Sequence, residues 1–154
     1  MCGRFTLHHA TEEITQRFNI DDFTLSFQPR YNIAPTQPVA AVLQNKSRTL
    51  EPLQWGLVPF WAKDPKIGNR MINARAETVA EKPAFRAAFK YRRCLIPTSG
   101  YYEWRKIDDE RLPTYIHRAD SAPFAFAGLW EEWHAPEGDL LHTCTIITTE
   151  ASDQ

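Results

Sequence analysis

The sequence predicts an α+β fold in which a mostly antiparallel β-sheet closes towards a barrel, with a few short helices packed on it. Three observations predict this class. Strand-like stretches clearly outnumber helix-like ones, they follow one another at hairpin-like spacing, and 11 prolines interrupt the 154 residues. With 43% hydrophobic and 24% charged residues, the composition is that of one globular domain spanning residues 1–154.

Most of the expected elements are strands with apolar or alternating residues between turn-forming ones. They are 3–7, 23–27, 39–43, 49–55, 94–97, 100–104, 113–117, 124–128 and 141–149. Thr11 is placed to cap a first helix that carries Ile14 and Phe18 on one face. A second helix is expected over 83–89, because proline suits a first turn. Two prolines make 30–38 a rigid loop.

Charge and cysteine usage exclude several classes of protein. The net charge of −1 argues against a strongly basic nucleic-acid coat, although arginines can still cluster locally. The three cysteines have no CxxC spacing, which excludes the common zinc patterns, and their odd number argues against a disulfide framework. We expect Cys94 and Cys144 in the core. The histidines show no metal-ligand spacing, so no metal or cofactor is expected. No apolar run approaches membrane length, and we expect a cytoplasmic protein with no membrane partner.

Cys2 follows the initiator methionine and is small, so removal of Met1 is plausible. A leading cysteine has a free amine with a pKa near ~7.7–8.0 beside a thiol near ~8.5. The amine can condense with an aldehyde, and the thiolate can then close on the imine carbon to give a thiazolidine ring. No internal cysteine can do this, because its nitrogen is an amide. On these few residues alone, the simpler interpretation is that Cys2 has no special role.

Two polar residues lie in apolar surroundings. Glu103 lies between Tyr102 and Trp104, where desolvation would raise its pKa and suit proton transfer, but an outward-facing glutamate on an alternating strand fits the pattern better. Asn73 lies where a strand would bury it. It must find partners for its amide, and it could equally orient a substrate or hold a loop.

Aromatic and basic residues admit two interpretations as well. Phe60 and Trp61 would be either hydrophobic plugs or stacking surfaces, and composition favours plugs. The arginines are dispersed in sequence, and a phosphate groove would need them to converge in space. They are Arg4, Arg30, Arg70, Arg75 and Arg86.

Taken together, five co-linear segments resemble the SRAP family, the SOS response-associated peptidase or abasic-site-processing domains. The late segment 146–151 is similar to that family too. The five segments are Met1-Cys2-Gly3-Arg4-Phe5, Arg30-Tyr31-Asn32-Ile33-Ala34-Pro35, Trp55-Gly56-Leu57-Val58-Pro59, Ile72-Asn73-Ala74-Arg75-Ala76-Glu77-Thr78 and Gly100-Tyr101-Tyr102-Glu103-Trp104.

The resemblance implies a monomeric, barrel-like domain that acts on abasic sites in single-stranded DNA. Cys2 would cross-link to the ring-opened sugar, Asn73 would hold that sugar, and Glu103 would act as general acid and base. The implied DNA contacts are Arg4, Asn32, Pro35, Phe60, Trp61, Arg75 and Tyr102. In a bacterial cell the protein would be associated with the nucleoid.

One departure from the family pattern lies at the end of the chain. The pattern continues past 148–151 to a motif with an active-site histidine, which has no counterpart before Gln154, so the domain resembles a C-terminally shortened one.

Two other functions stay open. One is a thiol peptidase or autopeptidase in which Cys2 attacks an amide. The other is a non-covalent single-strand binder or adaptor that uses arginines and Trp61.

Overall fold

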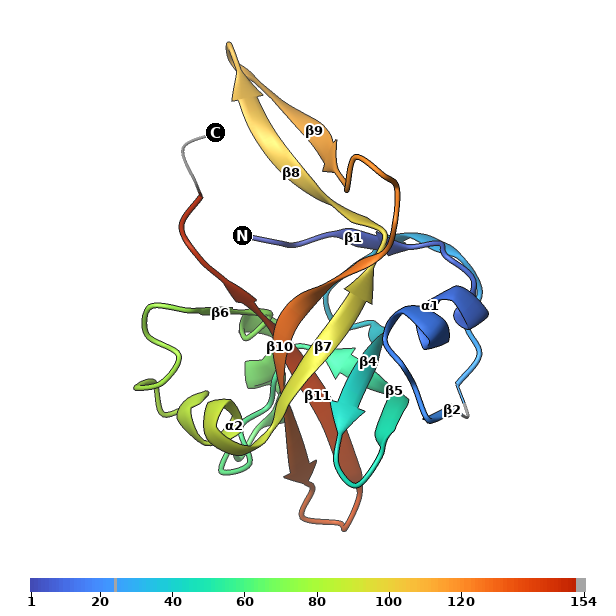
Figure 1. The fold of residues 1–154 in the computed structure, drawn as a ribbon. Helices are drawn as coiled ribbons and strands as arrows, with labels where there is room; N and C mark the ends of the chain where they lie inside the picture. Colours follow the sequence, from blue (N-terminus) through green and yellow to red (C-terminus); the bar gives the residue numbers. More distant parts are fainter. Residues whose placement is uncertain (24, 152–154) are drawn as a thin grey trace.

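The computed structural model describes residues 1–23 and 25–151, and its strands form two connected sheets (Figure 1). Three short helices accompany them: α1 (Thr11–Arg17), the 3-10 helix η1 (Pro65–Arg70) and α2 (Arg86–Tyr91). The strands, in chain order, are β1 (Phe5–Leu7), β2 (Asp22–Phe23), β3 (Arg30–Ile33), β4 (Pro38–Gln44), β5 (Arg48–Trp55), β6 (Asn73–Arg75), β7 (Arg93–Thr98), β8 (Gly100–Ile107), β9 (Glu110–Ile116), β10 (Phe124–His134) and β11 (Leu140–Thr148).

The larger sheet closes into a barrel of five strands. Its order is β2-β5-β4-β7-β10-β11-β6, and an additional pairing of β5 with β11 joins the ends of the five inner strands. The β4–β5, β4–β7, β7–β10 and β10–β11 ladders are antiparallel, whereas β11 runs parallel to both β5 and β6. The expected mostly antiparallel, barrel-like α+β fold is therefore confirmed.

The smaller sheet, β3-β1-β8-β9, lies at one end of this barrel and carries the N-terminus (Figure 1). The chain passes from the barrel into it between β7 and β8, at Gly100. A Cβ atom at Gly100 would lie 2.4 Å from the Tyr115 ring and 2.8 Å from the Ile116 carbonyl oxygen. Only glycine permits that close approach, so Gly100 fixes how the β8–β9 hairpin leaves the barrel.

The core joins the two sheets through aromatic contacts. Phe5 of β1 and Trp55 of β5 are both buried, with ring centroids 5.2 Å apart in an edge-to-face arrangement. Burial of two such side chains stabilises the fold by several kcal/mol, on the order of 25 cal/mol per Å² of apolar surface. Trp55 also donates a hydrogen bond of 3.0 Å from Nε1 to the carbonyl oxygen of Ile72, immediately before β6. The core thus fixes the start of β6.

Several expectations for local structure are confirmed. The hairpin of β4 and β5 forms around residues 45–47, with Val42 opposite Leu50. Cys94 and Cys144 are both buried and free, as their apolar surroundings indicate. The strands expected from 100, 113, 124 and 141 onward are present, although β8, β9 and β10 are longer than predicted and β9 begins at Glu110.

Other expectations are wrong, and each for a physical reason. The strand expected over 23–27 is limited to β2, because Phe27 donates its N–H to the Thr11 hydroxyl, 3.3 Å away, rather than to a ladder; Thr24 lies outside the described residues. Thr11 is therefore not the N-cap, which is Ala10. The expected loop 30–38 contains a strand, β3, which pairs with β1.

The second helix also begins later than predicted. It starts at Arg86 rather than at Pro83, and residues 83–85 form a turn. The Pro83 carbonyl oxygen instead accepts a hydrogen bond from Trp61. Pro83 thus lies outside the helix and takes part in a tertiary hydrogen bond with Trp61.

Candidate active site at the N-terminus

Three residues predicted to act together converge at the start of the chain. The Asn73 side-chain Nδ2 donates a hydrogen bond of 3.0 Å to the main-chain carbonyl oxygen of Cys2. The α-amine of Met1 lies 3.6 Å from Oε1 of Glu103. The residues come from β6, from the segment before β1, and from β8, so folding alone brings them together.

Asn73 is held from both sides. Its main chain pairs with Ile146 of β11, and the preceding carbonyl oxygen, that of Ile72, accepts from Trp55. Its Oδ1 is buried and has no hydrogen-bond partner within the described residues. A buried acceptor without a partner costs free energy, so this oxygen would gain from a hydrogen-bond donor supplied by a ligand.

Glu103 faces into a cleft rather than outward. Along β8 side chains alternate, so Tyr101 and Glu103 share the face that lines this cleft, whereas Tyr102 lies 5.1 Å from Tyr115 in a separate aromatic pair. Glu103 is 35% exposed. Of its aromatic neighbours, Tyr101 and Trp104 line this cleft together with Glu103.

Tyr101 is a site residue that the sequence reasoning missed. Burial, and then the negative charge of Glu103, raise the pKa of its phenol. The signal was present, since alternation in residues 100–104 places Tyr101 two residues before Glu103 on the same face.

The cleft is large enough for a sugar and its neighbours. Its volume is about 740 Å³, and its lining comes from the N-terminus, from the β8–β9 hairpin, from the start of β10 and from the end of β11. The residues that line it are Met1, Cys2, Tyr101, Glu103, Trp104, Arg105, Ile116, Phe124, Phe126 and 146–151. Acidic, basic, aromatic and aliphatic groups therefore surround Cys2.

With Met1 attached, Cys2 is a poor nucleophile. It is only 4% exposed, while Met1 is 84% exposed at the mouth of the cleft. Burial, assisted by the nearby charge of Glu103, raises the pKa of the Cys2 thiol to about 12. The thiol is thus protonated at neutral pH and its nitrogen is an amide, so the arrangement gains a reactive amine only when Met1 is lost.

Three of the predicted DNA contacts, Arg4, Asn32 and Tyr102, gather where β1, β3 and β8 meet. Arg4 donates from Nη1 to Oδ1 of Asn32 at 3.1 Å. The Tyr102 hydroxyl donates to the main-chain oxygen of Tyr31 at 3.3 Å, and its N–H donates to the Arg4 oxygen at 3.0 Å. Pro35 lies in the turn that follows β3. Asn32 therefore orients the Arg4 guanidinium, and both residues are at least partly exposed.

Arg75 is surrounded by carboxylates. Its Nε lies 3.6 Å from Glu77 and its Nη2 lies 3.8 Å from Glu150. Glu77 also accepts from the Thr149 hydroxyl at 3.0 Å, and hydrogen bonds from its own main-chain N–H and from Thr149 lower its pKa. The predicted phosphate ligand is thus paired with acidic side chains in this structure.

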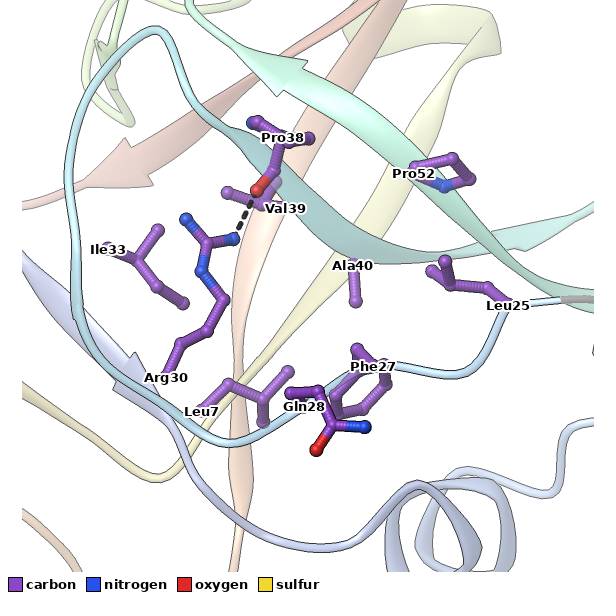
Figure 2. Close-up of a pocket in the computed structure, with 10 residues that line it drawn as sticks. All are labelled: Leu7, Leu25, Phe27, Gln28, Arg30, Ile33, Pro38, Val39, Ala40 and Pro52. Carbon is purple, nitrogen blue, oxygen red and sulfur yellow. Dashed lines mark hydrogen bonds between the residues drawn. The ribbon is translucent and has the colours of Figure 1, made fainter.

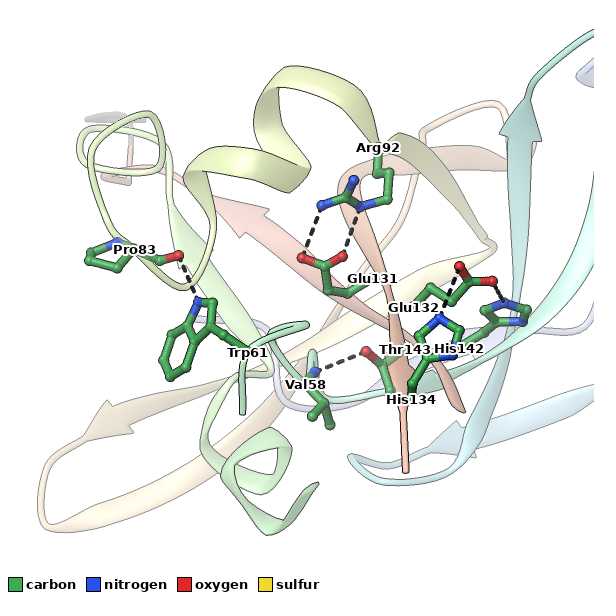
Figure 3. A network of polar contacts seen from close by, with 9 residues as sticks. All are labelled: Val58, Trp61, Pro83, Arg92, Glu131, Glu132, His134, His142 and Thr143. Carbon is green, nitrogen blue, oxygen red and sulfur yellow. Dashed lines mark hydrogen bonds and ion pairs between the residues drawn. The ribbon is translucent and has the colours of Figure 1, made fainter. Parts of the chain in front are cut away.

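Phe60 and Trp61 are exposed by 58% and 50%, so the expectation that they are buried plugs is wrong. Both follow β5, and neither lines the cleft at Cys2. The Trp61 indole donates from Nε1 to the Pro83 oxygen at 3.4 Å, which fixes the loop against the segment before α2 (Figure 3). The exposed rings are available for stacking.

Arg30 belongs to a different, mainly apolar cavity of about 210 Å³ (Figure 2). Its guanidinium donates to the Pro38 carbonyl oxygen, and from Nη2 to Gln37 Oε1 at 2.7 Å. Gln37 Oε1 in turn accepts from the Ala34 N–H at 3.1 Å. Arg30 therefore holds the turn between β3 and β4 and is not directed at the candidate active site.

Within residues 1–23 and 25–151, no three histidine, cysteine or acidic side chains group closely enough to hold a metal ion. No helix there has the length and apolar character needed to span a membrane.

The fold and the cleft define a barrel-type α+β domain whose candidate active site is built around an N-terminal cysteine. A family model described as SOS response associated peptidase (SRAP) matches residues 1–154, and the chain belongs to this family. It is 50% identical over 157 residues to the abasic site processing protein YoaM of Bacillus subtilis, covering 99% of this chain and 69% of that protein. It is 32% identical to the abasic site processing protein YedK of Escherichia coli, covering 100% and 69%.

Solved structures agree with the fold. A crystal structure of a protein from Bacteroides thetaiotaomicron superimposes with a TM-score of 0.87 at 27% identity, covering 98% of this chain and 69% of that one. A second, from Bordetella bronchiseptica, gives a TM-score of 0.84 at 24% identity, covering 99% and 74%. The latter likeness concerns the fold alone.

Proposed function

We propose that this protein recognises abasic sites in single-stranded DNA and bonds to them covalently through Cys2 after Met1 is removed. The observation that carries the proposal is the convergence of Asn73 and Glu103 on the first two residues. Relatives with up to 50% identity are named abasic site processing proteins, which supports the choice of substrate. The product would be a thiazolidine that shields the lesion.

The proposed reaction needs no cofactor. The ring-opened abasic sugar carries an aldehyde, and the Cys2 amine adds to its carbon with loss of one water to give an imine. The thiol sulfur then bonds to the same carbon, while its proton passes to the nitrogen. Two new bonds, C–N and C–S, tie the sugar to one residue, and both depend on a free α-amine.

Asn73 and Glu103 have distinct roles in this scheme. Asn73 would fix the Cys2 main chain through its carbonyl, and its buried Oδ1, which has no partner among the described residues, would accept a hydrogen bond from a sugar hydroxyl. The Glu103 carboxylate contacts the α-amine of Met1, the residue that precedes Cys2, and is therefore close to the Cys2 nitrogen. A carboxylate there can take a proton from the attacking amine and return it to the departing hydroxyl.

The proposed DNA contacts lie on the segment before β1, on β3 and the turn after it, on β6, on β8 and on the exposed loop after β5. Cationic and amide groups would bind phosphates, while Phe60 and Trp61 would stack on bases. The proposed contacts are Arg4, Asn32, Pro35, Phe60, Trp61, Arg75 and Tyr102. Arg75 would have to exchange Glu77 and Glu150 for a phosphate, so its contribution depends on competition between anions.

The structure favours cross-linking over the autopeptidase alternative. A thiol attacking its own preceding amide must first be deprotonated, and the pKa of the Cys2 thiol is raised to about 12 while Met1 is attached. Removal of Met1 by a separate aminopeptidase avoids that requirement. Non-covalent binding is a step within the proposal, because the strand must bind before it reacts, and we expect a monomer to suffice.

The test is a denaturing gel of the purified protein mixed with a single strand that contains one abasic site. We expect a shifted band without any reductant. Cys2→Ala should form none, since the sulfur is needed to close the ring. A protein with one additional residue retained before Cys2 should form none either, because the amine is then an amide.

Cys2→Ser is the matched variant, since it keeps the leading amine and loses the sulfur. We expect no stable band from it, but a band after borohydride treatment, which would trap the imine. If Cys2→Ala gives as much unreduced adduct as the native protein, the proposal fails. If binding is retained with no adduct from any form, the protein is a non-covalent binder.

A further inference from the structure

The exposed side of α2 carries a basic hollow distinct from the cleft at Cys2. Arg86, Lys90 and Arg93 surround a hollow of about 620 Å³, which Tyr91 also lines and which is floored by small and apolar residues. No acidic side chain is among its lining residues. In a chain with 19 acidic and 18 basic residues, three cations together without an anion is a local excess.

These cations have no counter-charge of their own. All three are exposed, and within the described parts of the chain no carboxylate lies within 4.0 Å of any of them. Arg86 and Lys90 are also four positions apart on one helix, where like charges repel and destabilise the helix. The arrangement is therefore unfavourable for α2 alone and favourable for an anion bound to it.

The opposite face of α2 connects it to the candidate active site. Ala88 and Phe85 of this face pack in one core cluster with Ala74, the residue after Asn73. The turn before α2 is joined to the exposed loop by the Trp61–Pro83 hydrogen bond (Figure 3). The helix thus lies beside both the strand that carries Asn73 and the aromatic loop proposed to stack on bases.

An aromatic ring accompanies the charges. Tyr91 is 70% exposed, and the Lys90 ammonium lies 5.2 Å from its ring centroid. A single strand of nucleic acid offers repeated negative charges on its phosphates and flat π faces on its bases. The spaced cations of this face suit the phosphates, and the exposed ring between them suits a base. The face matches an acidic peptide less well, since a peptide leaves the ring without a flat partner.

We infer that the Arg86–Lys90–Arg93 face is a second nucleic-acid contact, which binds the phosphates of the single strand beyond the lesion. This inference rests on the proposed function for the identity of the ligand. The strand would pass from the cleft across the loop of Phe60 and Trp61 and reach α2. The outer contact would raise affinity and residence time, while the chemistry at Cys2 stays the same.

The experiment measures binding of a lesion-free single strand as a function of salt, which separates this contact from the cross-link. Each lost phosphate contact on a single strand lowers the slope of log affinity against log salt by about 0.7. We expect Arg86→Ala combined with Lys90→Ala to lower the slope by about 1.4 and the affinity about tenfold. Adduct yield on a short abasic strand at saturating concentration should be unchanged.

The matched control is Arg17→Ala combined with Lys46→Ala, which removes the same charge from exposed positions on α1 and on the β4–β5 turn. Equal affinities and slopes for the two double variants would overturn the inference. So would binding of poly-glutamate that is lost in the α2 variant while DNA binding is kept, since the face would then serve acidic proteins. If no adduct forms in the native protein but the slope still falls, the proposed function fails and the α2 contact stands.

Discussion

A hydrogen bond of 3.0 Å joins the side-chain amide of Asn73 to the main-chain carbonyl oxygen of Cys2, 71 positions away. Asn73 begins β6, whose position is fixed by the barrel strand β11 and by the buried Trp55. The barrel therefore holds Cys2 by its main-chain carbonyl, whereas its thiol donates to the Arg4 main-chain oxygen, 3.8 Å away. This is positioning by the scaffold rather than by the reactive groups themselves.

Asn73→Ala should slow cross-linking and destabilise the protein slightly. A hydrogen bond of this kind contributes about 1 kcal/mol, so we expect about a fivefold lower rate of adduct formation and a loss of about 1 kcal/mol in the free energy of unfolding. Single-turnover gels and urea unfolding measure the two effects. Asn45→Ala, on the exposed β4–β5 turn, is the control and should change neither. A full cross-linking rate in Asn73→Ala would contradict the positioning role.

Glu103→Gln should keep the fold and lose most of the rate. The amide preserves size and polarity but cannot take a proton, and general acid–base groups contribute about 10²–10⁴-fold. We expect the rate at saturating DNA to fall by about 10²-fold, with DNA affinity largely kept. Glu110→Gln, at the other end of the same hairpin, should behave as the native protein does. Equal rates for both variants would remove Glu103 from the mechanism.

The ion pair between Arg92 and Glu131 should be important for stability. Glu131 is 2% exposed. Its Oε2 accepts a hydrogen bond of 3.1 Å from Nη2 of Arg92 (Figure 3). Its Oε1 lies 2.8 Å from Nε of Arg92, without the alignment of a hydrogen bond. Arg92→Ala would leave the carboxylate buried and unpaired, which costs about 3 kcal/mol. Urea unfolding measures this. Glu132→Gln, in an exposed pair with His142, should cost less than about 1 kcal/mol.

Stability should fall at alkaline pH because of the buried thiols. Burial raises the pKa of Cys94 from its ordinary value of 9.0 to about 12. Between those values the unfolded chain has released the proton and the folded chain has not, so rising pH favours unfolding by about 1.4 kcal/mol per pH unit. Cys94→Ser should be less stable near neutral pH but should lose stability less steeply above pH 9. The same slope in both proteins, measured under reducing conditions, would contradict this.

The sequence was most informative where one regular pattern covers a whole element. The hairpin of β4 and β5 could be predicted because β4 is a continuous apolar run, buried from Val39 to Leu43, and a short polar turn separates it from β5. Boundaries were wrong where a tertiary hydrogen bond competes with a local preference. Thr11 accepts from Phe27 instead of capping α1, and Pro83 accepts from Trp61 instead of beginning α2.

The candidate site could likewise be predicted only in part. The types of Cys2, Asn73 and Glu103 could be identified from their segments, but their convergence depends on strand pairing between residues far apart in sequence. The pairing of Arg75 with Glu77 and Glu150 could not be predicted for that reason. Nor could the hollow on α2, because its cations become neighbours only once the boundaries of α2 are known.

Covalent capture through Cys2 is tested most directly by the intact mass of the native protein before and after it is mixed with an abasic single strand. We predict a protein lighter by one methionine, and then an adduct equal to protein plus DNA minus one water, stable without reductant. A protein that retains Met1 and still forms that adduct would refute capture by the Cys2 amine and thiol, as would one that has lost Met1 and forms none.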